Sequence, residues 1–196
     1  MMNKKIVILG AGESGIGAAF LGIKKGYEVF LSDKESIDQR LQKILDENNI
    51  SWESGQHSLS KIKTADFIVK SPGIPSDLPL ISLLKSQGKK IISEIEFAAR
   101  HTSATLIGIT GTNGKTTTTL LTYKILKDAG LNVGIAGNIG KSFAFQVAKM
   151  NFDYYVLEIS SFQLDDIIDF APKISVITNI SPDHLERYNY NFENYI

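Results

Sequence analysis

Residues 105–117 read TLIGITGTNGKTT, an apolar run that leads through glycines into Gly-Lys-Thr. The β-branched stretch Thr105–Thr110 predicts a buried strand, and the residues after Gly114 have the spacing of a helix. A strand, a glycine loop and a helix in this order predict a phosphate-binding loop, because backbone N–H groups at the helix start can bind phosphate oxygens. Lys115 would reach the β- and γ-phosphates, and the Thr116 hydroxyl could bind Mg²⁺.

The glycine spacing of this loop departs from the common G-x-x-x-x-G-K-[ST] pattern. That pattern would begin at position 109, which is Ile109, whereas the glycines stand at positions 108 and 111. A helix start that contains Gly-Lys-Thr by chance is the alternative, and the apolar strand directly before the loop disfavours it. The residues predicted to bind the nucleotide phosphates are Gly111, Thr112, Asn113, Gly114, Lys115, Thr116 and Thr117.

Strand and helix signals alternate along the whole chain. Strand-like runs occur at Lys5–Leu9, Tyr27–Leu31, Phe67–Val69, Lys90–Ile92, Val133–Ile135, Tyr154–Ile159 and Ile174–Thr178. The alternation predicts an α/β fold of parallel sheets covered by helices. We expect a Rossmann-like parallel-sheet domain over residues 1–93, followed by a P-loop α/β domain over residues 94–196. Because a polar strand end lies close to the last residue, we expect the second domain to be truncated.

The composition excludes several classes of protein. Lys+Arg and Asp+Glu both number 21, and this balance argues against binding to nucleic acid or to an anionic membrane. The chain has no cysteine, which excludes disulfides and cysteine metal sites. No apolar run approaches the roughly 18 residues of a membrane span, and the first one is broken at Gly10. We expect a cytoplasmic protein without membrane insertion.

A second glycine loop follows the first predicted strand. Residues 10–15 read GAGESG and fit G-x-G-x-x-G, whose glycines let a ligand phosphate approach a helix N-terminus. Asp33 follows the second strand, where an acid can bind a ribose hydroxyl. The segment Ser71-Pro72-Gly73 ends the next strand and can border the same crevice. The alternative for residues 10–15 is a plain tight turn that binds no ligand. The alternative for residues 71–73 is a rigid turn without a ligand, and this segment taken by itself favours that interpretation.

Three more segments place polar groups at strand ends. Glu158 ends an apolar strand, where a carboxylate can hold Mg²⁺ directly or through water. His184 closes NISPDH at residues 179–184 and could bind a second cation or a substrate phosphate. Asn138 stands between glycines in GNIG at residues 137–140, which permit close backbone approach. The alternatives are that Glu158 is a solvated strand end, that His184 is a structural histidine, and that residues 137–140 form an ordinary loop.

Together these motifs resemble those of the Mur ligase family. GITGTNGKTTT at residues 108–118 is similar to the family's ATP loop, including its altered glycine spacing. Further blocks are similar in family order: GNIG at 137–140, LEISSFQL at 157–164 and NISPDHL at 179–185. The loop at residues 10–15 and SPGI at residues 71–74 point to the D-glutamate-adding branch. The resemblance covers essentially the whole chain.

The resemblance implies an ATP-dependent carbon–nitrogen ligase of peptidoglycan synthesis that acts through an acyl phosphate. The first domain would bind the uridine diphosphate of UDP-N-acetylmuramoyl-L-alanine, the second would bind ATP and Mg²⁺, and D-glutamate would supply the amine. The implied substrate-binding residues are Gly12, Ser14, Gly15, Asp33, Ser71, Pro72, Gly73, Asn138, Ser160 and His184. The implied catalytic residues are Lys115, Glu158 and His184, and the implied metal ligands are Thr116, Glu158 and His184. We expect a monomer.

The chain also departs from the family pattern. Glu13 stands where family members vary. Beyond the His184 block the family carries a lysine that is carbamylated in the working enzyme, and then a third domain that binds the amino acid. Since neither falls within these residues, we expect this chain alone to be inactive as a ligase, to bind ATP weakly and to retain binding of UDP-type ligands.

Three other functions stay open at this point. They are an L-alanine-adding ligase of the same family, a nucleotide-binding module without catalysis, and a nicotinamide-dependent dehydrogenase built on residues 10–15. The dehydrogenase leaves the phosphate loop and Glu158 without a role. The other two histidines, His57 and His101, have no comparable polar company in the sequence, and we interpret them as surface or packing residues.

Overall fold

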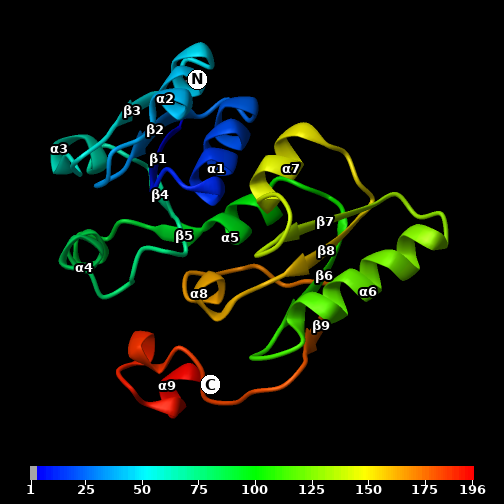
Figure 1. Ribbon diagram of the computed structural model, residues 1–196. Coiled ribbons are helices and arrows are strands. Elements are labelled where there is room, and N and C mark those ends of the chain that lie inside the picture. Colours follow the sequence, from blue (N-terminus) through cyan, green and yellow to red (C-terminus); the bar gives the residue numbers. More distant parts are fainter. Residues whose placement is uncertain (1–3) are drawn as a thin grey trace.

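The computed structural model describes residues 4–196 and contains two parallel sheets (Figure 1). The first has the strand order β3-β2-β1-β4-β5 and the second β7-β8-β6-β9. The strands of the first sheet are β1 (Lys5–Leu9), β2 (Glu28–Ser32), β3 (Ser51–Glu53), β4 (Phe67–Lys70) and β5 (Ile91–Ser93). Those of the second are β6 (Thr105–Thr110), β7 (Val133–Gly137), β8 (Tyr154–Glu158) and β9 (Ile174–Ile177). The predicted α/β fold with parallel sheets is confirmed.

Helices connect these strands and cover both faces of each sheet. In chain order they are α1 (Glu13–Lys24), α2 (Gln39–Glu47), α3 (Leu59–Ile62), α4 (Pro79–Ser86), α5 (Glu94–Ala99), α6 (Lys115–Asp128), α7 (Phe143–Lys149), α8 (Ser161–Leu164), the 3-10 helix η1 (Leu185–Tyr188) and α9 (Phe192–Tyr195). In β1, Ile6 and Ile8 point to the side of α1, whereas Val7 and Leu9 point to the side of α3 and α4. This alternation follows from the two-residue period of a strand and explains why its run is apolar throughout.

A layer of three helices, α1, α5 and α7, lies between the two sheets. One apolar cluster extends from Ile8 in β1 through Leu21 in α1 to Phe143 in α7 and Leu157 in β8. The approach of α1 to α7 depends on Gly17, because a Cβ there would overlap the Oγ of Ser142 at the start of α7. The two sheets therefore share one hydrophobic core.

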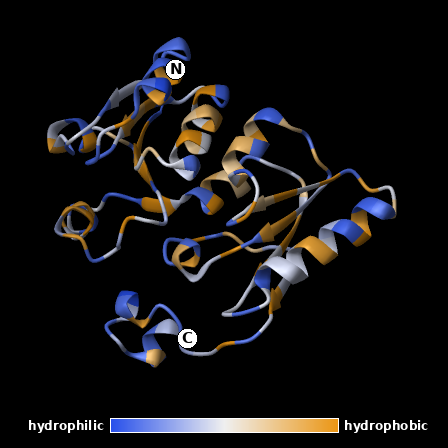
Figure 2. Cartoon of the chain, in the orientation of Figure 1, coloured by the Kyte–Doolittle hydropathy of each residue, from blue (hydrophilic) through white to orange (hydrophobic). Residues whose placement is uncertain are grey.

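The opposite face of the second sheet is covered by α6. Tyr123 and Leu126 of this helix pack on Ile107 and Val156 of the sheet. Hydrophobic and hydrophilic turns follow one another along α6 in Figure 2, and Ile125 is exposed on its outer side. Among residues 4–196, no helix combines the length and the apolar composition that a membrane crossing requires.

Four short elements differ from the sequence-based expectation. Three of them, the strand β3 and the helices α3 and α8, were not predicted. They are too short for their hydrophobic residues to show the period of a strand or a helix. The fourth is α9 at the end of the chain, where the sequence showed no helix signal. Asn191 caps α9 by accepting a hydrogen bond from the N–H of Glu193 at 3.0 Å. An extended segment after β9 leads to η1 and α9, which Figure 1 shows below α8.

Glu94 is a buried acid at the junction of the three shared helices. Its Oε1 accepts a hydrogen bond from the N–H of Ala144 in α7, and its Oε2 has no hydrogen-bond partner in the part of the chain that the structure describes. Burial, the largest effect, raises the pKa of Glu94 to about 7, although hydrogen bonds from Ala144 and Ser142 oppose the shift. The folded protein therefore binds a proton here more readily than the unfolded chain.

We predict that the free energy of unfolding decreases as the pH rises from about 5 to about 8, since deprotonation of Glu94 costs more in the folded state. Glu94→Gln mimics the protonated acid and should remove this contribution, which makes the variant more stable than the wild type at pH 8 by up to about 3 kcal/mol. Urea unfolding of both proteins at the two pH values measures the difference. The same pH dependence in wild type and variant would contradict the prediction.

Candidate functional site

The phosphate loop joins β6 to α6. Gly111 has a φ of +133° and Gly114 a φ of +81°, conformations that glycine adopts with the least strain. A Cβ on Gly111 would overlap Thr178 Oγ1 and approach the carbonyl oxygen of Asn179, both just after β9. The N–H of Thr112 donates to that same carbonyl at 3.0 Å. The loop is therefore held against the end of β9.

Lys115 begins α6 and folds back over the loop. Its Nζ donates to the carbonyl oxygens of Gly111 at 2.6 Å and Thr112 at 2.8 Å. The cation thus faces the same loop whose N–H groups can bind phosphate, which is the arrangement that a nucleotide phosphate requires. Thr116 and Thr117 are exposed on the first turn of α6.

Glu158 ends β8 as a buried carboxylate with one free oxygen. Its side chain is held by Asn138, whose Nδ2 donates to Oε1 at 2.7 Å and whose N–H donates to the Glu158 carbonyl at 2.8 Å. Gly137 permits this contact, because a Cβ there would overlap the Glu158 carbonyl. Within residues 4–196 the Oε2 of Glu158 has no hydrogen-bond partner. A buried oxygen without a partner is costly, so the group fits a cation or a ligand donor.

A pocket of about 240 Å³ opens at the carboxyl ends of the second sheet. It brings together five of the predicted residues, namely Gly111, Lys115, Asn138, Ser160 and His184. The His184 ring packs on Phe162 with 5.2 Å between ring centroids. Glu158 does not line the pocket itself and meets it through Asn138.

The predicted metal ligands Thr116, Glu158 and His184 are not gathered into one group. No three His, Asp or Glu side chains cluster as a possible metal site among the described residues. Magnesium keeps several waters and commonly binds one or two carboxylates together with substrate phosphates. The free Oε2 of Glu158 and the exposed Thr116 hydroxyl suit that requirement, and His184 lines the pocket together with Lys115 and Asn138.

The glycine loop of the first sheet lies against the loop that follows β4. Gly10 has a φ of +97°, and a Cβ there would collide with Ser71 Oγ. The Oδ2 of Asp33 accepts a hydrogen bond from the N–H of Ala11 at 2.6 Å. Residues 10–15, Asp33 and Ser71 therefore lie together at the carboxyl ends of β1, β2 and β4.

The first turn of α1 offers backbone donors at this edge of the first sheet. Gly12 is the N-cap and supplies no side-chain hydrogen bond, so the N–H groups of Ser14 and Gly15 have no capping acceptor. In the loop after β4, the Pro72 carbonyl accepts a hydrogen bond from Arg187 of η1 at 3.3 Å, and Gly73 is exposed.

Arg187 was not expected at the site. Its guanidinium lies 4.5 Å from the ring centre of Phe162, so it links the loop after β4 to the aromatic wall of the pocket. The only sequence signal is its position three residues after His184, one turn further along the chain. That spacing could have indicated a shared location, although not the contact with Pro72.

His57 has polar neighbours, which contradicts the interpretation drawn from the sequence. Its Nδ1 lies 2.7 Å from Ser32 Oγ, which also donates to Glu53 Oε1 at 2.8 Å. Burial, the largest effect, lowers the pKa of His57, and the charges of Asp33 and Glu53 oppose the shift. The expectation failed because β3 was not recognised, and this strand places Glu53 beside β2. His101 packs edge-on against aromatic rings, as a packing residue does.

Two protein-family models match the chain, one over each of the two sheets. The family model of the MurD-like Mur ligase N-terminal domain matches residues 4–93, and that of the Mur ligase middle domain matches residues 109–196. The chain belongs to the Mur ligase family. It is 58% identical over 193 residues to a UDP-N-acetylmuramoylalanine–D-glutamate ligase of Bacteroides fragilis, and that match covers 98% of this chain. A relative with the same name in Christiangramia forsetii is 54% identical over 195 residues.

The chain spans 44% of the length of these two relatives. Solved structures of Mur ligases show the same fold. The UDP-N-acetylmuramate–alanine ligase of Thermotoga maritima superposes with a TM-score of 0.59 at 22% identity, over 97% of this chain and 45% of that one. The UDP-N-acetylmuramate:L-alanyl-γ-D-glutamyl-meso-diaminopimelate ligase of Neisseria meningitides gives a TM-score of 0.58 at 22% identity, over 100% of this chain and 68% of that one.

The two positive-φ glycines of the phosphate loop provide a matched test. We predict that Gly111→Ala lowers the free energy of unfolding by at least about 3 kcal/mol, because strain adds to the overlap with the end of β9. Gly114→Ala has open space around it and should cost only about 1 to 2 kcal/mol. Urea unfolding measures both values. Equal losses would show that the loop is not packed against Thr178 and Asn179.

Proposed function

We propose that this chain is the substrate- and ATP-binding part of an ATP-dependent ligase that joins D-glutamate to UDP-N-acetylmuramoyl-L-alanine in peptidoglycan synthesis. The observation that carries the proposal is the pocket where Lys115, Asn138, Ser160 and His184 meet. Arg187 connects this pocket to Pro72, in the loop that lies against the glycine loop of the first sheet. The identity to relatives that bear this name supports it. We place the domain division at residue 93, and we propose a monomeric cytoplasmic protein.

The proposed reaction has two steps. A carboxylate oxygen of the UDP substrate attacks the γ-phosphorus of ATP, and the bond from this phosphorus to ADP breaks. The amine nitrogen of D-glutamate then attacks the carbonyl carbon of the acyl phosphate, inorganic phosphate leaves, and the nitrogen releases a proton. Both steps place negative charge on phosphate oxygens, so catalysis depends mainly on positioning and on cationic neutralisation.

The phosphate loop supplies the neutralisation. Residues 111–117 bind the ATP phosphates through backbone N–H groups, and Lys115 exchanges its two carbonyl contacts for phosphate oxygens. Thr116 and the free Oε2 of Glu158 would hold Mg²⁺, and a bound Mg²⁺ would neutralise charge on the transferring group. Asn138 keeps Glu158 oriented, since its side chain donates to the Glu158 carboxylate and its backbone N–H donates to the Glu158 carbonyl.

The remaining residues hold the UDP substrate across both sheets. Gly12, Ser14 and Gly15 bind the diphosphate at the start of α1, and Asp33 organises that loop through Ala11 while it binds the nucleoside. Residues 71–73 border the same crevice. Ser160 and His184, which line the pocket of the second sheet, orient the part of the substrate that reacts.

Calorimetric titration of this chain with UDP-N-acetylmuramoyl-L-alanine tests the substrate assignment. We predict saturable binding, and Asp33→Ala should raise the Kd at least about tenfold, because both the ligand contact and the Ala11 contact are lost. Asp128→Ala is the matched control, since that acid is exposed at the far end of α6 and pairs with Lys124. Binding of NAD in place of the UDP compound by the folded protein would refute the proposal and favour a dehydrogenase.

Phosphate release tests the reaction in a protein extended to the length of the curated relatives. We predict activity that requires the UDP substrate and D-glutamate together, and Lys115→Met should lower kcat by about 10²-fold or more. Lys124→Met changes an exposed lysine of the same helix and should leave kcat unaltered. Faster turnover with L-alanine than with D-glutamate would overturn the assigned specificity.

A further inference from the structure

Lys70 is a buried cation directly before the loop that borders the UDP-substrate crevice. Its side chain is 1% exposed, and its Nζ donates to the Ile74 carbonyl at 2.6 Å. The backbone of the next residue, Ser71, donates to the Leu9 carbonyl at 2.9 Å, beside the glycine loop. Lys70 therefore holds the last residue of the loop Ser71–Ile74 against the end of β4.

The counter-ion of Lys70 comes from the second half of the chain. Asp166 lies just after α8, its side chain is 4% exposed, and its Oδ2 is 2.9 Å from Lys70 Nζ. Three further groups of the first half converge on the same residue. They are the N–H of Ser93 at 2.9 Å from the Asp166 carbonyl, and Ser76 Oγ and Lys85 Nζ, each 3.4 Å from a carboxylate oxygen.

Net stability does not explain this pair well. Burying two charges costs desolvation energy that their attraction often only offsets, and apolar residues of similar size are commonly as stable. A buried pair does, however, specify one geometry, because each charge has to find its partner. Here the geometry that it specifies is the position of Ser71–Ile74 relative to the segment that follows Ser160 and Ser161 in the second half.

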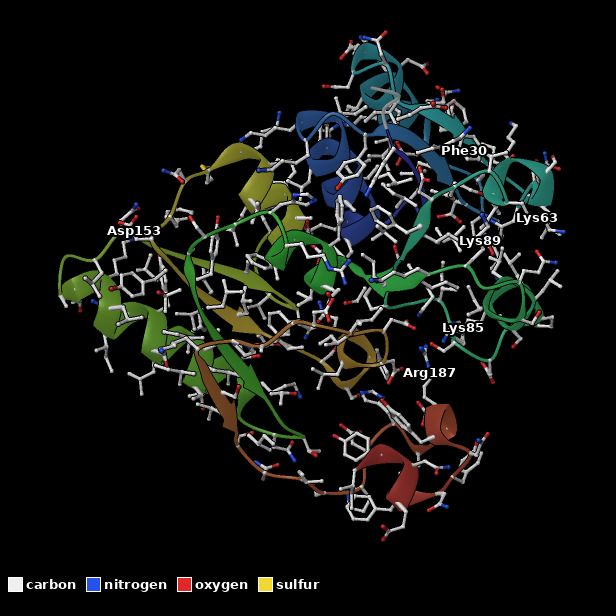
Figure 3. All side chains as sticks on the ribbon, turned by 180° about the vertical axis from the view of Figure 1, so that it is seen from behind. Phe30, Lys63, Lys85, Lys89, Asp153 and Arg187 are labelled. Atoms are coloured by element: carbon white, nitrogen blue, oxygen red, sulfur yellow. The ribbon has the colours of Figure 1, made fainter. Side chains whose placement is uncertain are left out.

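We propose that Lys70 and Asp166 are a positioning pair, which fixes the loop Ser71–Ile74 of the UDP-substrate crevice to the second half of the site. The loop is thus held from two sides, by Lys70 at Ile74 and by Arg187 at Pro72. Figure 3 shows Arg187 and Lys85 pointing toward this region from η1 and α4. The tether is a feature of the fold, while its effect on the UDP substrate rests on the proposed function.

Hydrogen exchange of the ligand-free protein tests the tether. The Ile74 N–H is bonded to the Ser71 carbonyl at 3.0 Å and reports on the loop. We expect Lys70→Met to increase the exchange rate of this amide about tenfold, the factor that loss of one charge-assisted hydrogen bond produces. Lys85→Met is the matched control, because it removes an exposed cation from the same acid without touching the loop, and it should change the rate less than about twofold.

The double variant Lys70→Met/Asp166→Leu separates positioning from stability. It leaves no unpaired buried charge, so we expect it to unfold at nearly the same urea concentration as the wild type. Its Kd for UDP-N-acetylmuramoyl-L-alanine should nevertheless rise about tenfold, because the Ile74 carbonyl still lacks its donor. If Lys70→Met alone fails to fold, the double variant still tests the positioning role through its Ile74 exchange rate and its Kd.

The results distinguish the positioning role of Lys70 and Asp166 from the proposed function. Unchanged Ile74 exchange in the folded double variant, or wild-type affinity for the UDP substrate in the same variant, would overturn the positioning role. If the wild type does not bind the UDP substrate but Lys70→Met accelerates Ile74 exchange, the tether stands and the proposed function falls.

Discussion

The packing of α1 on α7 is the contact on which the two sheets depend for their relative position. Gly17 allows it, because any side chain there would collide with Ser142. Helix α1 begins at the glycine loop of the first sheet, and α7 follows the GNIG segment that holds Glu158. This helix contact therefore helps to set the distance between the glycine loop at residues 10–15 and the pocket beside the phosphate loop. Misplacement of either by about 1 Å would be expected to affect a reaction that spans both.

The polar groups of the second site are held mainly by one another. Lys115 bonds to the carbonyls of its own loop, Asn138 bonds to Glu158, and one oxygen of Glu158 keeps no partner within residues 4–196. Asn138 and Glu158 are thus already oriented before a ligand arrives, so little ordering of this pair is needed upon binding. The same logic applies to the first crevice, where Asp33 shapes the glycine loop through the N–H of Ala11.

Much of this arrangement could be predicted from the sequence, because its signals are local. A strand, a glycine loop and a helix start are adjacent in the chain, and parallel strands bring Glu158 and Lys115 to one sheet edge without knowledge of any tertiary contact. The unpredicted parts depend on long-range contacts. Lys70 reads as an ordinary strand-end lysine until Asp166 is placed beside it, and His57 gains its polar neighbours only through the three-residue strand β3.

The shared helix layer also constrains the order of events during synthesis. Lys24 at the end of α1 bonds to the Ala148 carbonyl, 124 positions further along the chain. Until α7 has left the ribosome, the part of α1 around Gly17 lacks its α7 partner, although α5 and all strands of the first sheet already exist. Part of the α1 surface is therefore uncovered while the second half is translated, and transiently exposed apolar surface of this kind is what chaperones bind.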